Sequence, residues 1–153
     1  MRKIIYLRPD GGLSVVHPVI NTFGEAPGFT ENDALQRALA KLPVNAINPQ
    51  VVEANAIPTD RTFRNAWKVS GAGIAVDMPK AREIHRVKLR DLRKPKMEAL
   101  DAAYLRADET GDIAEKQRIA AQKQALRNVT ADPAIEAAQT PEQLKAVMPA
   151  ILL

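Results

Sequence analysis

The two histidines, His17 and His85, are the side chains best suited to acid–base chemistry near neutral pH. Catalysis by either would need a nucleophile or a carboxylate at a spacing that brings it to the imidazole. His17 precedes a proline at the end of a predicted strand, and His85 lies on a strongly basic predicted helix. No Ser or Asp spacing suggests a triad with either one. We therefore interpret both as structural residues and expect no enzymatic activity.

Metal and cofactor chemistry finds little support in the residue types. The chain has no cysteine, which excludes thiolate zinc sites, iron–sulfur clusters and disulfides. Asp108, Glu109 and Asp112 surround a predicted turn, where helix capping alone explains acidic residues. The glycines at 71 and 73 lack the following Gly-Lys-Ser/Thr of a phosphate loop and indicate a turn. We expect no metal and no cofactor.

The segment from Lys80 to Lys96 is the most basic part of the chain. It contains eight basic and two acidic residues, a net charge of +6 against +4 for the whole chain. A helix that contacts nucleic acid would present such cations to phosphates. Because the cations lie almost all round the predicted helix and no aromatic residue is interleaved, a solvated or protein-facing helix is the simpler interpretation. The candidate phosphate contacts under the alternative are Arg82, Arg86, Lys88, Arg90 and Arg93.

The segment around residue 67 holds the only tryptophan, in a chain with few aromatic residues. Phe63 and Trp67 are spaced i, i+4, which favours a core pair on one face of a short helix. A partner interface is the alternative, because a single indole can bury ~150–250 Å². The candidate partner contacts are Arg61, Phe63, Arg64 and Trp67.

A small α+β unit is predicted over residues 1–78. Residues 3–7 and 13–16 are β-prone and flank a Pro-Asp-Gly turn, which predicts a hairpin. After a loop at 21–28, Thr30 and Asp33 form a predicted capping box for a helix over 31–42, with Phe29 packing on Ala34. A turn at Asn48-Pro49 leads to a strand over 50–54.

The remaining elements of this unit are a short helical turn over 61–67 and a second hairpin about residues 71–73. Most connections are too short for crossover helices, so we expect an antiparallel sheet.

Residues 79–153 are predicted to be helical. A helix over 79–108 contains Pro95, which predicts a kink or break near Arg93. Asp112 caps a second helix over 113–129, and the short connection predicts antiparallel packing. The facing surface is rich in alanine and thin, so we expect this hairpin to need a partner.

Two short helices, over 134–138 and 144–148, and an apolar tail at 149–153 complete the chain. The second of these helices has the clearest start signal in the sequence, formed by Thr140, Pro141 and Gln143. The predicted fold is therefore α+β: a small antiparallel sheet with one helix, then a kinked antiparallel helical hairpin and two short C-terminal helices.

Length and hydropathy restrict the location of the protein. At 153 residues the chain fits one domain or a small domain with a helical extension. It has no run of ~18 apolar residues that could span a membrane. Arg8 ends the first apolar run too early for the core of a signal peptide. We expect a protein of the cytoplasm, or of a particle assembled there, with no membrane contact.

Four segments carry a resemblance to a known group of proteins: residues 58–67 (PTDRTFRNAW), 78–86 (MPKAREIHR), 123–135 (KQALRNVTADPAI) and 140–146 (TPEQLKA). Together they resemble small proteins encoded by tailed bacteriophages and prophages, commonly among tail genes. The resemblance covers about residues 55–148, together with a similar N-terminal hairpin. No catalytic residues come with it.

The resemblance implies a non-enzymatic structural or assembly protein that acts in the tail, neck or fibre region through protein–protein contacts. The expected partners are other tail or virion proteins and further copies of the chain, in the virion or in the host cytoplasm during assembly. A tail assembly chaperone absent from the mature virion has the same features. A nucleic-acid-binding accessory protein that uses residues 80–96 is the remaining alternative.

Overall fold

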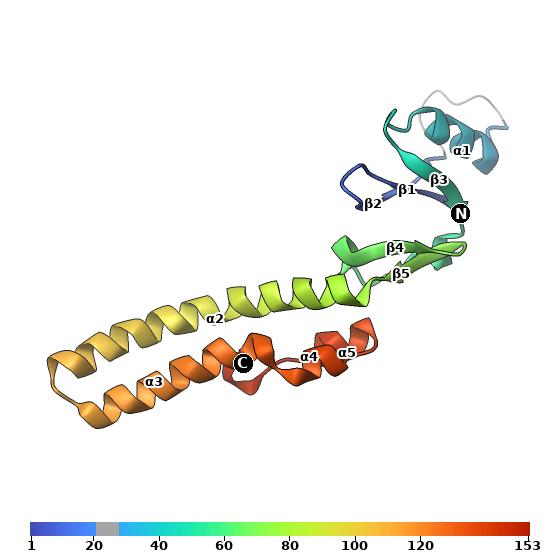
Figure 1. The fold of residues 1–153 in the computed structure, drawn as a ribbon. Coiled ribbons are helices and arrows are strands. Elements are labelled where there is room, and N and C mark those ends of the chain that lie inside the picture. The colour runs from blue at the N-terminus through green and yellow to red at the C-terminus, as the bar shows by residue number, and fades with distance from the viewer. Residues whose placement is uncertain (21–27) are drawn as a thin grey trace. The chain divides into compact units, whose positions relative to one another are not determined.

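The computed structural model describes residues 1–20 and 28–153 of an α+β protein. The chain divides into two compact units, Met1–Asp77 and Met78–Leu153, hereafter unit 1 and unit 2. The described residues of unit 1 form five strands and one α-helix, whereas the elements of unit 2 are all helical (Figure 1). The boundary lies one residue before the predicted end of the first part at residue 78.

The first hairpin is formed by β1 (Lys3–Leu7) and β2 (Leu13–Val16), with the predicted bounds. The two strands pair antiparallel, with Ile4 opposite Val16. The turn closes because the Arg8 carbonyl accepts from Gly11 N–H at 2.9 Å and the Asp10 carboxylate accepts from Gly12 N–H at 2.8 Å. Gly11 has φ +76°, a conformation that glycine adopts without steric cost.

The third strand, β3 (Ile47–Val52), pairs antiparallel with β1, giving the order β2-β1-β3. The prediction placed this strand at 50–54, after a turn at Asn48-Pro49, and is wrong at both ends. Asn48 has φ +48°, and the register shifts between Ile5 and Leu7. An edge strand tolerates Pro49 because one of its sides needs no ladder donor, and asparagine accepts the left-handed region.

The sheet is covered on both faces. One face contributes Ile5, Leu13 and Val52 to a cluster with Trp67 of a second sheet, formed by β4 (Trp67–Ser70) and β5 (Gly73–Val76). Side chains alternate along a strand, so the buried Ile4 points to the opposite face. There α1 (Glu31–Ala40) packs on β1 and buries Ala34 and Leu35. Two small sheets thus replace the single predicted one.

The capping box of α1 is confirmed: Thr30 accepts from Asp33 N–H, and the Asp33 side chain accepts from Thr30 N–H at 2.8 Å. The helix ends at Ala40, two residues earlier than predicted, and Lys41 forms its C-cap. Phe29 stacks with the Arg37 guanidinium, 4.6 Å from the ring centroid. Of the loop predicted for 21–28, residues 21–27 lie outside the described residues.

Unit 2 is built on a helical hairpin of α2 (Met78–Glu109) and α3 (Ile113–Asn128), which run side by side (Figure 1). Gly111 turns the chain with φ +69°. Asp112 caps α3 as predicted, because its carboxylate accepts from Glu115 N–H at 2.9 Å. The antiparallel hairpin and both helices are therefore confirmed, each within a residue of its predicted bounds.

Of the kink or break predicted near Arg93, the break does not occur, since α2 continues through Pro95. An interior proline removes one helical hydrogen bond and costs ~3 kcal/mol. Basic side chains before and after Pro95 bond α2 to other parts of unit 2. Arg93 donates to the carbonyl of Arg127 at 3.1 Å, and Lys96 donates to that of Ile151 at 3.1 Å.

Four short elements follow the hairpin. They are the 3-10 turns η3 (Val129–Ala131) and η4 (Ala150–Leu152) and the helices α4 (Pro133–Ala137) and α5 (Pro141–Ala146). The predicted short helices are confirmed, including the Thr140–Gln143 capping box. These elements bury Ile135, Leu144 and Leu152.

This C-terminal segment supplies the apolar cover that the hairpin was predicted to take from a partner. Within α2, Leu92 is 38% exposed, whereas His85 is buried. No helix in residues 1–20 or 28–153 is long and apolar enough to cross a membrane.

Candidate functional site

The predicted partner contacts at 61–67 separate into a buried pair and an exposed pair. Phe63 and Trp67 are each 4% exposed and belong to the core. They do not share an α-helical face, because the chain forms the 3-10 turn η2 (Arg64–Ala66) and Trp67 begins β4. The burial of these two aromatic residues favours the core interpretation over the alternative of a partner interface. Arg61 and Arg64 are exposed.

Trp67 carries an unusual polar atom. Its Nε1 is buried and has no hydrogen-bond partner within the part of the chain that the structure describes. An unpaired buried donor costs about 1–3 kcal/mol. The indole is nevertheless retained among Ile5, Leu13 and Val52, so apolar packing dominates at this position.

Four basic side chains of unit 1 gather near one end of the first sheet. Val16 lies opposite Ile4, so one residue further along this antiparallel pair His17 comes beside Lys3. Positive charge on Lys3, Arg61 and Arg64 reaches His17, although burial is the larger cause of the lowered pKa of its imidazole. We call Lys3, His17, Arg61 and Arg64 the basic cluster.

The neighbouring carboxylate of Asp60 accepts from the backbone N–H and the hydroxyl of Thr62, at 2.8 and 2.6 Å. Sequence reasoning identified Arg61 and Arg64 but missed Lys3 and His17. The register of the correctly predicted hairpin was the signal that could have found them, because it places these two residues side by side.

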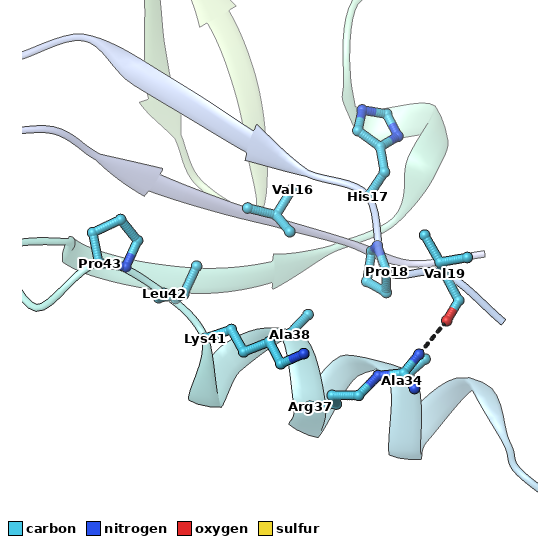
Figure 2. A pocket seen from close by; sticks show the side chains of 10 residues that line it. All are labelled: Val16, His17, Pro18, Val19, Ala34, Arg37, Ala38, Lys41, Leu42 and Pro43. Carbon is cyan, nitrogen blue, oxygen red and sulfur yellow. Dashed lines mark hydrogen bonds between the residues drawn. The ribbon is translucent and has the colours of Figure 1, made fainter. Parts of the chain in front are cut away.

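A separate cleft of about 400 Å³ lies between α1 and the end of β2. Figure 2 shows Ala34 and Ala38 of α1 facing Val16 and Pro18, while the His17 ring points away from α1. The Arg37 guanidinium crosses the cleft and donates to the Val19 carbonyl at 2.8 Å. The walls are largely apolar, and this bond ties the helix to the chain that follows β2.

In unit 2, one face of α2 binds backbone carbonyls. Arg82 donates to Ala138 at 2.9 Å and to Ile135 at 3.1 Å, at the end of α4. Arg86 donates to Thr130 at 3.3 Å in η3. With His85, Arg93 and Lys96, these side chains form what we call the carbonyl-binding face.

The acceptors on this face share one feature: each lies at or near the end of a helical element. The last carbonyls of a helix lack intrahelical partners and carry the negative end of its dipole, so cations stabilise them. Arg86 also pairs with Glu83 and Glu136, and the hydrogen bond to Glu136 raises the pKa of Arg86.

The carbonyl-binding face changes the interpretation of the basic helix. Three of the five candidate phosphate contacts, Arg82, Arg86 and Arg93, are bound to the chain's own carbonyls. Arg82 and Arg86 are only 15% and 19% exposed. Lys88 and Arg90 are exposed and are the two members of that set left for a ligand.

The other residues singled out for chemistry have local structural roles. Asp108 pairs with Lys116, and Asp112 caps α3. Gly71, with φ +57°, turns the β4–β5 hairpin. The imidazole of His85 is hydrogen-bonded through Nε2 to the Val147 carbonyl. Within residues 1–20 and 28–153, no three potential metal-ligating side chains come together.

The basic cluster is thus the group of polar side chains best placed to meet a ligand. No protein-family model, no curated protein and no solved structure matches the chain.

Proposed function

We propose that this chain is a non-enzymatic structural or assembly protein of a tailed bacteriophage, acting in the tail, neck or fibre region through protein–protein contacts. The resemblance of residues 58–67, 78–86, 123–135 and 140–146 to small phage tail-gene proteins supports the phage assignment. The same resemblance fits a virion component and an assembly chaperone that leaves before maturation.

The proposed contact with a protein partner rests on which basic side chains are already bonded within the chain and which are exposed. Arg82, Arg86 and Arg93 of α2 bind backbone carbonyls within unit 2. Arg61 and Arg64 of unit 1 are exposed, and both lie in the segment that carries part of the resemblance. This distribution supports a protein partner for unit 1. It weakens the nucleic-acid alternative, because that alternative needs the α2 cations.

Apolar residues near the turn of the helical hairpin support contacts between copies. Leu105 near the end of α2 is 62% exposed, and Ile113 at the start of α3 is 70% exposed. Exposed large apolar side chains near one end of a hairpin offer surface for association. We therefore include a homo-oligomer within the assembly in the proposed function.

The test is quantitative mass spectrometry of purified mature particles from the phage or induced prophage that encodes the chain. A fixed copy number relative to the major tail protein supports a virion component. Abundance in the lysate together with absence from particles supports the chaperone. Absence from particles and from every complex with tail proteins contradicts the proposal.

A further inference from the structure

The three cations of the basic cluster, Lys3, Arg61 and Arg64, are hydrogen-bond donors only. In the described part of the chain, the side chains of Lys3, Arg61 and Arg64 have no carboxylate or hydrogen-bonding partner. Asp10, the acidic residue nearest to Lys3 in sequence, pairs with Arg8, and Asp60, which precedes Arg61, binds Thr62. Unpaired like charges repel one another, so an anionic ligand would be bound favourably here.

The cluster draws on separate segments of the fold. His17 and Lys3 stand side by side at the ends of β2 and β1, and Arg61 and Arg64 come from the segment that leads into β4. All three cations influence the one imidazole. Figure 2 shows the ring of His17 directed away from α1.

The chemistry of the cluster favours carboxylates of a protein over a nucleic acid. The planar guanidinium of arginine binds a carboxylate through two parallel hydrogen bonds. A single-stranded nucleic acid would also need exposed aromatic rings for stacking, and the two aromatic residues of this segment, Phe63 and Trp67, are buried. A duplex would need a row of cations along its backbone rather than one compact group.

We propose that the basic cluster binds a short acidic segment of the protein partner, with neighbouring Asp or Glu carboxylates against Arg61, Arg64 and Lys3. This inference rests on the proposed function and specifies its partner surface. A carboxylate bound beside His17 would offset the surrounding positive charge and favour the imidazolium form. Binding should therefore be accompanied by a rise in the pKa of His17.

The test uses the full chain and a fluorescein-labelled hexaglutamate peptide, with hexaglutamine and a single-stranded oligothymidine as comparison ligands. The variant is Arg61→Glu with Arg64→Glu. The matched control is Lys88→Glu with Arg90→Glu, which changes the net charge equally at exposed positions of α2. The fluorescence of Trp67, the only tryptophan, verifies that unit 1 of each variant is folded.

We expect hexaglutamate to bind at low salt and hexaglutamine not to bind. The cluster variant should lose about tenfold or more in affinity, while the control changes by less than about twofold. NMR titration should show a higher pKa for His17 with hexaglutamate present. Equal losses in both variants, or no binding by the native chain, would overturn the inference. So would stronger binding of oligothymidine that disappears in the cluster variant, since that identifies a phosphate site.

Incorporation into particles separates this inference from the proposed function. If the cluster variant is lost from particles while the control variant is retained, the result supports both the proposed function and the binding of an acidic segment. Normal incorporation of the cluster variant overturns the inference and leaves the proposed function standing. If the native chain associates with no tail protein, the proposed function fails, while the peptide titration still decides whether the cluster binds carboxylates.

Discussion

His85 donates a hydrogen bond through Nε2 to the carbonyl oxygen of Val147, 2.8 Å away and 62 residues further along the chain. This bond joins the buried face of α2 to the residue that ends α5. Burial lowers the pKa of His85, an effect that the charge of Lys88 reinforces and the bond to Val147 opposes. The neutral imidazole is therefore the form that the folded chain accommodates.

Unit 2 should lose stability in mild acid. Because the folded-state pKa of His85 lies below 6.5, its contribution is complete above that value. As the pH falls below 6.5, the unfolded chain binds a proton that the folded chain does not, and the free energy of unfolding decreases. His85→Gln keeps a donor without this titration, so urea unfolding followed by far-UV circular dichroism should depend less on pH.

His17→Gln is the matched control for that prediction. The pKa of His17 is also lowered, but His17 lies in unit 1, where Trp67 fluorescence reports unfolding. His17→Gln should leave the pH dependence of the helical transition unchanged. A helical transition equally sensitive to pH in native chain and His85→Gln would contradict the assignment.

Arg82 should contribute more to the stability of unit 2 than the exposed cations of α2 do. Arg82→Met leaves the carbonyls of Ile135 and Ala138 without this donor, so we expect a loss of about 1–3 kcal/mol in the unfolding free energy of unit 2. Lys88→Met removes an exposed cation with no such bond and should change the unfolding free energy of unit 2 by less than about 0.5 kcal/mol. Denaturant titration by circular dichroism measures both, and equal effects would contradict the role of the carbonyl-binding face.

Residues 78–153 should fold alone. The sequence suggested that this part would be poorly stable unless associated, but Ile135, Leu144 and Leu152 cover the hairpin from within the same unit. We expect the fragment to unfold cooperatively in a thermal scan, even at concentrations too low for self-association. Removal of residues 149–153 takes away Leu152 and the acceptor of Lys96, and should lower the midpoint by several degrees. An unfolded fragment would contradict the expectation.

Self-association should depend on the residues near the hairpin turn. Leu105→Ser with Ile113→Ser removes the exposed apolar side chains there and should shift the chain toward monomer in size-exclusion chromatography with light scattering. Val87→Ser is the control, because Val87 is also an exposed apolar residue of α2. An equal shift for the control would indicate non-specific hydrophobic association and contradict a specific contact at the hairpin turn.

Interactions within a few residues were predictable from sequence. The capping boxes at Thr30 and Thr140 and the cap at Asp112 join residues three apart, so the residue types alone indicate them. The β1–β2 hairpin and the bounds of its strands followed in the same way from the turn at Pro9. These signals located most of the helices and strands.

Contacts between distant segments were not predictable. Nothing in the spacing of Arg82 and Ile135, 53 residues apart, indicates that they are bonded. The i, i+4 spacing of Phe63 and Trp67 suggested one helical face, yet pairing of Trp67 with Val76 in β4–β5 determines the backbone there. Tertiary packing, which a single sequence does not display, decided both cases.

The irregular edge of β3 bears on how two copies of this chain could pair through their sheets. Pro49 lacks an N–H, and Asn48 at φ +48° turns the neighbouring peptide out of regular extension. A strand interrupted in this way is a poor template for a strand of another molecule. Edge-to-edge pairing of strands is therefore disfavoured at β3, and contacts at this edge are left to side chains.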